Sequence, residues 1–277
     1  MNIEEIIKNA LLEDVGEGDH TTLSTVPADA VKHARMIAKQ NGIICGTEIA
    51  AKVFTTIEPS LTVEILRRDG ESVVAGDVIL RVSGKAQSIL TGERTALNFI
   101  QRMSGIATKT YFLAQKTAGT KAQLLDTRKT TPLLRELEKY AVKCGGGSNH
   151  RFGLFDMVLI KDNHVDFAGG IKAAILTAND YLAKQGKRLE IEIEVRNFDE
   201  LQEALQTGNV HRIMLDNFTP EQIRTALTMI DGKYPVEASG GITEENIRQY
   251  AETGVDYISV GALTHHIKSL DISLLAD

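Results

Sequence analysis

Arginine, lysine and histidine side chains gather in the segment Asp126–His164. This segment has seven Lys and Arg residues against five Asp and Glu residues, although the formal net charge of the whole chain is −6. Arg128 and Lys129 end the run "LLDTRK", and His150 and Arg151 directly follow the run "GGGSN". A guanidinium beside an ammonium suits a carboxylate or a phosphate, and salt confines its field to about 10 Å. The segment therefore predicts a site for a small molecule with several negative charges.

Acidic side chains stand at the ends of two later apolar runs. Glu192 and Glu194 alternate in "LEIEIEVRN", which puts both on one face of a strand, and Asp216 ends "RIMLD". Two carboxylates at neighbouring strand ends suit Mg²⁺ that is shared with substrate phosphates and water. The alternative is a salt bridge from this acidic pair to Lys161 or Arg151, because an unpaired buried carboxylate is costly.

Two further runs, "VEASGGITEENI" and "DYISVGALTH", each end in small residues before an expected helix. Backbone N–H groups at the start of a helix bind anions, and the last two loops of a β/α barrel often hold a phosphate. The pairing of the two runs favours a phosphate pocket over ordinary loop glycines.

The elements that must position these residues follow from hydrophobic periodicity. Six short apolar runs alternate with helical segments, which indicates a parallel sheet built from βα units. Polar residues stand at the C-terminal ends of the runs, where the loops of a β/α barrel build the active site. With only six strands, the barrel is expected to be open or irregular. The runs are 122–129, 157–164, 189–197, 212–217, 235–241 and 256–262.

The first hundred residues have a different pattern. Apolar residues at helical spacing predict a helix from Ile3 to Leu11, and a longer helix is expected over about 88–114. Strands are predicted within 31–39, 61–70 and 77–84. A further helix is expected to be capped by Thr130 or Thr131, with Pro132 in its first turn, and to end at Gly145.

Composition excludes several classes of protein. The 277 residues are 43% hydrophobic and 25% charged, as is usual for a soluble globular protein, and the acidic balance argues against general nucleic-acid binding. No apolar run is long enough to span a membrane, and the first residues do not have the pattern of a signal peptide. Cys45 and Cys144 have neither metal-site nor disulfide spacing, so a reducing cytoplasm is expected.

Several motifs, taken in order, resemble the quinolinate phosphoribosyltransferase family. They are "GERTALNFIQRMSGIAT", "DTRKTTP", "KYAVKCGGGSNHR", "LIKDNH", "LDN", "EASGGI" and "GVDYISVGALTH". The likeness begins at "LLEDVGEGDHTT" and continues almost to the C-terminus. Leu133 departs from it, because the family usually has glycine there, and His266 replaces a usual small residue.

The resemblance implies an α/β protein with an N-terminal α/β sandwich domain, 1–105, and an open, irregular β/α barrel domain, 106–266. The tail 267–277 is expected to return to the first domain. It also implies a homodimer, or an assembly of dimers, in which Arg94 completes the site of the neighbouring subunit. No nucleic acid or membrane partner is implied.

Site residues carry over to the positions that match the motifs. Lys129, Lys161, Glu194 and Asp216 are expected to be catalytic, with Glu194 and Asp216 also holding Mg²⁺ and Glu192 as an alternate for Glu194. The expected substrate-binding residues are Arg94, Thr127, Arg128, Lys129, His150, Arg151, Lys161, Glu194, Asp216, Ser239, Gly240, Gly241, Val260, Gly261 and Ala262.

The implied reaction joins quinolinate to phosphoribosyl pyrophosphate and gives nicotinate mononucleotide, pyrophosphate and CO₂ in NAD biosynthesis. Three other functions remain possible from the sequence. They are a Schiff-base barrel lyase using Lys161, a related pyrophosphorylase with another substrate, and a non-catalytic sensor of phosphorylated ligands. The sensor needs neither a second anion pocket nor paired acids.

Overall fold

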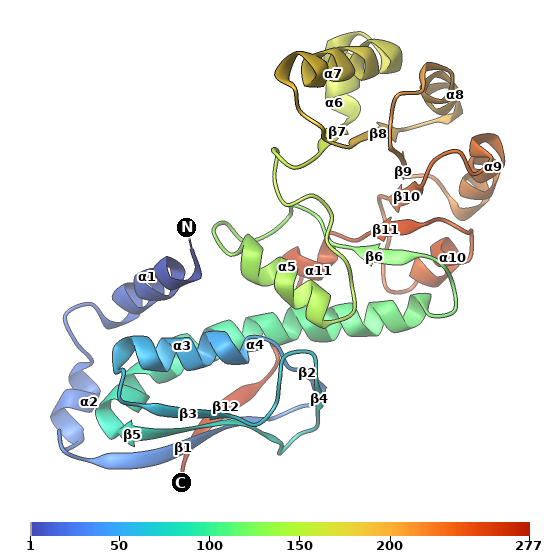
Figure 1. Ribbon diagram of the computed structural model, residues 1–277. Helices are drawn as coiled ribbons and strands as arrows, with labels where there is room; N and C mark the ends of the chain where they lie inside the picture. The colour runs from blue at the N-terminus through green and yellow to red at the C-terminus, as the bar shows by residue number, and fades with distance from the viewer. Residues whose placement is uncertain (1) are drawn as a thin grey trace. The chain divides into compact units, whose positions relative to one another are not determined.

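The computed structural model describes residues 2–277, which form two compact units (Figure 1). One unit contains the chain up to Tyr111 together with Thr130–Gly146 and Leu263–Asp277, and we name it the sandwich unit. The other, the barrel unit, contains Phe112–Lys129 and Gly147–Ala262. The domain limits expected from the sequence, 1–105 and 106–266, stay predictions.

An antiparallel sheet in the order β12-β1-β5-β3 forms the base of the sandwich unit. The strands are β1 (Val31–Ala38), β3 (Thr62–Ile65), β5 (Val78–Lys85) and β12 (Ile272–Ala276). β2 (Gly42–Ile43) and β4 (Ser72–Val73) form a separate pair. β12 comes from the C-terminal tail and pairs with β1, while Leu270 and Ile272 are buried in the same hydrophobic core.

Helices cover one face of this sheet. Figure 1 shows α3 and α4 along the same side, and Phe54 of α3 and Ile100 of α4 are fully buried in the core. The expected helices at the N-terminus and over 88–114 are confirmed as α1 and α4. The helices with residues in this unit are α1 (Ile3–Val15), α2 (His20–Thr25), α3 (Thr47–Ile57), α4 (Ala86–Thr117), α5 (Arg135–Cys144) and α11 (Ala262–His265).

Six parallel strands form the sheet of the barrel unit, in the order β6-β11-β10-β9-β8-β7. All six coincide with the apolar runs of the sequence, so that prediction is confirmed. The sheet is open, because in the described residues β6 and β7 are its two edges. The strands are β6 (Gln123–Leu125), β7 (Val158–Ile160), β8 (Ile191–Val195), β9 (Arg212–Asp216), β10 (Val236–Ser239) and β11 (Tyr257–Ser259).

Helices connect successive strands from β7 to β11, as βα units require. β8 is buried at every residue: its Ile and Val side chains alternate with Glu192 and Glu194, which share the opposite face. The connecting helices are α6 (Asp162–Ala168), α7 (Ile171–Gln185), α8 (Phe198–Thr207), α9 (Pro220–Ile230) and α10 (Ile247–Ala251). Among residues 2–277, no helix is both long and apolar enough to cross a membrane.

The expected start of α5 is wrong: the helix begins at Arg135 rather than after Thr130 or Thr131. The two threonine hydroxyls accept hydrogen bonds from arginine side chains and do not cap backbone N–H groups. Thr130 accepts from Arg135 Nε at 3.0 Å, and Thr131 accepts from Arg102 at 2.7 Å. Leu133 has a φ of +68°, whereas residues of a right-handed α-helix have a negative φ, so the helix begins only after Leu133. The expected end at Gly145 is confirmed.

A cluster of buried charges occupies the inside of the barrel unit. His150 Nε2 lies 3.0 Å from Glu192 Oε2 and 3.4 Å from Glu237 Oε2, while Arg212 lies 3.1 Å from Glu237. The Arg212 guanidinium also stacks over the Tyr257 ring, 4.2 Å from its centroid. Burial, and then the charge of Glu237, raise the pKa of Glu192 to about 7.

The protonation of His150 depends on its carboxylate neighbours and on a backbone hydrogen bond. Burial lowers its pKa, but the carboxylates of Glu192 and Glu237 outweigh burial and raise it to about 9, which would protonate both ring nitrogens. Yet the backbone N–H of Arg151 donates to His150 Nδ1 at 2.7 Å. A proton on Nδ1 would face that N–H donor to donor, so the hydrogen bond keeps Nδ1 unprotonated. The single imidazole proton therefore lies on Nε2 and faces the two carboxylates.

Leu133 provides a test of backbone strain. An L-residue in the left-handed region costs about 1–2 kcal/mol, and Leu133 is 68% exposed, so its side chain contributes little packing. We expect Leu133→Gly to be more stable than Leu133→Ala by about 1 kcal/mol, measured by urea unfolding. A less stable glycine variant would show that the left-handed turn is not strained.

The raised pKa of Glu192 makes stability depend on pH. Because the folded-state pKa lies above the ordinary value of 4.5, the stability linked to this group is complete below about pH 4.5 and is lost as pH rises through about 7. In Glu192→Gln, the fall in unfolding free energy between pH 5 and pH 8.5 should shrink by roughly 1–3 kcal/mol. The matched control is Glu190→Gln, an exposed residue just before the same strand. Equal pH profiles for wild type and Glu192→Gln would contradict the assignment.

Candidate active site

A cavity of about 290 Å³ opens among the C-terminal strand ends of the barrel unit. Five of its lining residues carry cationic or imidazole side chains, and one carries a carboxylate. The full lining is Thr127, Arg128, Lys129, His150, Arg151, Leu159, Lys161, Met214, Glu237, Ser239 and Ser259. Seven residues expected from the sequence are therefore brought to one place: Thr127, Arg128, Lys129, His150, Arg151, Lys161 and Ser239.

The buried carboxylate of Asp126 ties two of the cationic segments together. Asp126 follows β6 directly and is fully buried, and its Oδ1 accepts the backbone N–H of His150 at 2.9 Å. The chain next to it is held as well, because the N–H of Lys129 donates to the hydroxyl of Thr127 at 3.0 Å. This explains why residues 127–129 and 150–151 line the same cavity although some twenty residues separate them.

The loop that carries Arg151 is closed by Asp156. Its carboxylate accepts the N–H groups of Phe152 and Gly153 at 2.6 and 2.9 Å, and the Arg151 guanidinium donates to the carbonyl of Met157 at 3.3 Å. Burial, and then the positive charge of Arg128, lower the pKa of Arg151. Cations that repel each other in this way favour an anionic ligand between them.

Lys161 follows β7 and reaches the next strand end. Its ammonium lies 2.6 Å from Glu194 Oε2 at the end of β8. The salt bridge considered as an alternative for the acidic pair therefore exists, with Lys161 as the partner. Glu192 is directed instead into the buried cluster with His150 and Glu237.

Asp216 stands at the end of β9, next to the strand of Glu194. Its two oxygens accept from Ser239 Oγ at 3.2 Å and from Asn217 Nδ2 at 2.6 Å. The possible metal ligands at these strand ends are carboxylate, hydroxyl and amide oxygens, and Mg²⁺ prefers oxygen ligands. The residues therefore fit a magnesium ion that keeps several water ligands.

The two glycine loops differ in what they can offer a phosphate. Gly240 has a φ of +87°, and a Cβ there would come within 2.2 Å of Asn217 Oδ1, so only glycine fits. Gly241 also has a positive φ, +63°. The N–H of Val260 already donates to the carbonyl of Leu125 at 3.0 Å within the sheet. The other two residues expected to bind phosphate at this loop, Gly261 and Ala262, follow Val260 directly.

Arg94 is the one expected site residue in the sandwich unit, where it is an exposed residue of α4. Sequence reasoning also missed two residues of the site: Glu237, which lines the cavity, and Arg212 beside it. The signal was available for Glu237, since "VEAS" puts a carboxylate inside an apolar strand as "IEIEV" does. Arg212 sits at the start of its strand and gave no such signal.

This arrangement can bind two anionic groups and hold them close together. Cationic side chains from the ends of β6 and β7, and from the loop between them, face a shared space, and carboxylates at β8 and β9 stand beside it. These acids can support a metal ion or a developing positive charge. Among the described residues that line the cavity, none forms a nucleophile–base pair of the hydrolase type.

Family models match nearly the whole chain. The model "Quinolinate phosphoribosyl transferase, N-terminal domain" matches residues 19–104, and "Quinolinate phosphoribosyl transferase, C-terminal domain" matches residues 106–275.

Curated and solved relatives agree with these matches. "Nicotinate-nucleotide pyrophosphorylase [carboxylating], chloroplastic" from Arabidopsis thaliana is 43% identical over 291 residues and covers 100% of this chain and 83% of its own length. A Bacillus subtilis protein, "Probable nicotinate-nucleotide pyrophosphorylase [carboxylating]", is 40% identical over 274 residues. The match covers 99% of this chain and 93% of the Bacillus protein. The solved structure of the nicotinate-nucleotide pyrophosphorylase from Francisella tularensis has a TM-score of 0.94 at 41% identity. The match covers 99% of this chain and 96% of the Francisella chain.

These comparisons support neither the Schiff-base lyase nor the phospho-ligand sensor. Identity near 40% over the full length, with both domain models matched in order, leaves one conclusion. The chain belongs to the quinolinate phosphoribosyltransferase family.

Proposed function

We propose that the protein transfers the phosphoribosyl group of phosphoribosyl pyrophosphate to quinolinate and releases CO₂ and pyrophosphate. The product is nicotinate mononucleotide, a precursor of NAD. One observation carries this proposal: Arg128, Lys129, His150, Arg151 and Lys161 line one small cavity in a chain whose net charge is −6. Both substrates are polyanions, so cations must cancel their repulsion before they can react.

Quinolinate is held by its two carboxylates. Arg128 and Arg151 supply planar guanidinium groups, which match carboxylates with paired hydrogen bonds. Lys161 supplies a third cation, held in position by its ion pair with Glu194. This positioning brings the ring nitrogen toward the ribose, and correct placement of two reactants removes much of the entropic barrier.

Phosphoribosyl pyrophosphate fits the other side of the site. The ribose phosphate is placed at the backbone of Gly240, Gly241, Gly261 and Ala262, and Lys129 faces the pyrophosphate. Glu194 and Asp216 would hold Mg²⁺, which when bound neutralises charge on the departing pyrophosphate. The Glu194 carboxylate also stabilises the positive charge that develops at the anomeric carbon of the ribose.

The bonds change in two stages. The ring nitrogen forms a bond to the anomeric carbon as the bond from that carbon to the pyrophosphate oxygen breaks. The alkylated ring then accepts the electron pair left when the adjacent carboxylate departs as CO₂, and that carbon takes a proton. No side chain forms a covalent bond to substrate. Lys161 is engaged by Glu194, whereas a Schiff-base lysine must present a free amine.

The protein is also proposed to form dimers and to act in a particular cellular compartment. A homodimer, or an assembly of dimers, lets Arg94 of the partner subunit complete each site, which gives a role to an exposed arginine outside the barrel unit. The cytoplasm is the proposed compartment, supported by the two free cysteines of the described chain.

The direct test is turnover by the purified protein with both substrates and Mg²⁺. Quinolinate labelled in the carboxylate next to nitrogen should release labelled CO₂ in step with nicotinate mononucleotide. Binding of both substrates without release of CO₂ would favour the sensor, and a borohydride-trapped adduct on Lys161 would favour the lyase.

Removing either of two cations should reduce this turnover strongly. Arg128→Ala and Lys161→Ala should each lower kcat/KM by about 10²-fold or more, because each loses charge-assisted bonds to a polyanion. Lys187→Ala is the control, since Lys187 is exposed and lies outside the cavity. Near-normal rates in a folded Arg128 or Lys161 variant would refute its role.

Mixed dimers test the shared site. Arg94→Ala and Lys161→Ala protomers should each be inactive alone, yet a mixture should regain activity, because one site per hybrid dimer has both residues. Subunit exchange is verified by native mass spectrometry. Exchange without recovery would show that Arg94 does not act across subunits.

A further inference from the structure

Two cysteines and an aspartate converge in the sandwich unit, apart from the residues of the catalytic proposal. Cys45 precedes α3, Cys144 is the last residue of α5, and Asp69 lies in the loop between β3 and β4. Their two sulfur atoms and a carboxylate oxygen all lie within 4.8 Å of one another. The separation of Cys45 Sγ from Asp69 Oδ2 is 3.9 Å.

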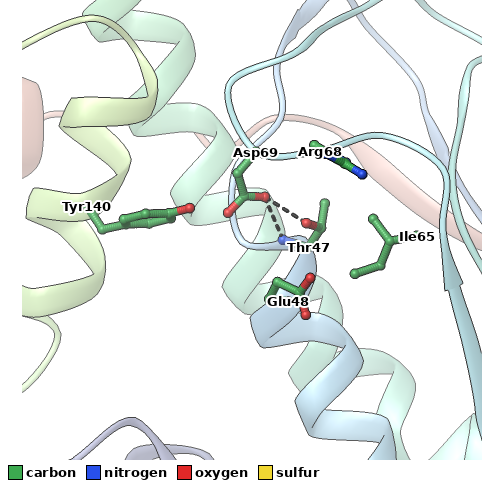
Figure 2. Close-up of a pocket in the computed structure, with 6 residues that line it drawn as sticks. All are labelled: Thr47, Glu48, Ile65, Arg68, Asp69 and Tyr140. Carbon is green, nitrogen blue, oxygen red and sulfur yellow. Dashed lines mark hydrogen bonds between the residues drawn. The ribbon is translucent and has the colours of Figure 1, made fainter.

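The Asp69 carboxylate is held in a fixed orientation. Its Oδ1 accepts both the backbone N–H and the hydroxyl of Thr47, at 3.0 and 2.8 Å, as Figure 2 shows. The other oxygen is thereby left facing the sulfur of Cys45. A ligand carboxylate oriented by a second residue is a recurring feature of metal sites.

The spacing agrees with tetrahedral coordination. Zinc–sulfur and zinc–oxygen bonds of about 2.3 and 2.0 Å put ligand atoms about 3.5–3.8 Å apart. Cys45 Sγ and Asp69 Oδ2 need to approach by only a few tenths of an ångström, and no pair in the cluster by more than about 1.3 Å. Cys45 is buried while Cys144 is half-buried, so the second thiol has room to adjust.

A cavity adjoins the cluster at Asp69. Tyr140, also from α5, points its hydroxyl toward Asp69 across a cavity of about 470 Å³ (Figure 2). Arg68 and Glu48 line the same cavity. A fourth ligand, either water or the Tyr140 oxygen, can therefore enter from this side.

We propose that Cys45, Asp69 and Cys144 form a binding site for a borderline-soft divalent cation, with Zn²⁺ the best match. Two thiolates and one carboxylate are zinc ligands and are poor ligands for Mg²⁺. The cation would link the end of α5 to the start of α3 and to the β3–β4 loop. The sequence gave no sign of this site, because its ligands come from three distant segments rather than from a short Cys motif.

Cobalt gives the sharpest test, since thiolate ligands produce a cobalt charge-transfer band that oxygen ligands do not. The experiment adds Co²⁺ to the reduced full-length protein from which all metal has been removed. The chain has only Cys45 and Cys144, so the charge-transfer band can come from no other thiol. We expect saturation at one Co²⁺ per chain, bands of tetrahedral cobalt, and displacement by Zn²⁺. Cobalt held only by Glu194 and Asp216 would give no thiolate band.

Variants locate the ligands. Cys144→Ser should lose about half of the charge-transfer intensity, and Asp69→Asn should weaken cobalt binding at least tenfold. Thr47→Val keeps all three ligands but removes one of the two hydrogen bonds that orient the carboxylate, and should weaken binding by about tenfold. Glu48→Gln, a carboxylate that lines the cavity outside the cluster, is the matched control and should bind as wild type does.

Two outcomes would overturn the site. One is the absence of a thiolate band in reduced wild-type protein at excess Co²⁺. The other is equal Zn²⁺ affinity in wild type and Cys144→Ser, with circular dichroism showing that the variant is folded. Because Cys45 is fully buried and its substitution can unfold the chain, these criteria use the wild-type protein and Cys144→Ser instead.

Discussion

Repulsion between like charges is the constraint on which the site depends. Two polyanionic substrates repel each other, and the cations that attract them repel each other as well. Arg128 and Arg151 are close enough for one charge to lower the pKa of the other. A folded chain keeps such groups together only if rigid backbone and buried acids hold them in place. In this protein, both supports come from the ends and the inside of one parallel sheet.

The supports can be traced residue by residue. Asp126 binds the backbone of His150, Glu194 binds Lys161, and Asp156 closes the loop of Arg151. Below them, Glu192 and Glu237 face the proton on His150 Nε2. Each of these acids therefore contacts a cation, an imidazole N–H or a backbone N–H of a residue that lines the cavity.

Much of the fold and part of the site could be predicted from the sequence. The six strands were visible as apolar runs because parallel strands are buried on both faces. The polar residues after Leu125 and Ile160 could be assigned to one face because the C-terminal ends of parallel strands meet there, and the cavity brings them together. The start of α5 could not be predicted, because Arg102 and Arg135 use the threonine hydroxyls that local rules assign to a cap.

Contacts between distant segments account for the rest. Nothing local marks Arg212 as the partner of Glu237, or Asp69 as a neighbour of Cys45 and Cys144. Leu133 is a different case: its departure from the family's glycine was visible, and the structure gives it a physical meaning as a residue with a φ of +68°.

Charge matching in the cavity is the central claim, and it is tested most directly by comparing two ligands that differ by one carboxylate. Isothermal titration with quinolinate and with nicotinate measures what the second carboxylate contributes. We predict that quinolinate binds at least about tenfold more tightly, as expected for one charge-assisted pairing, and that Arg151→Gln removes most of the difference. Equal affinity of the wild-type protein for both ligands would contradict the account.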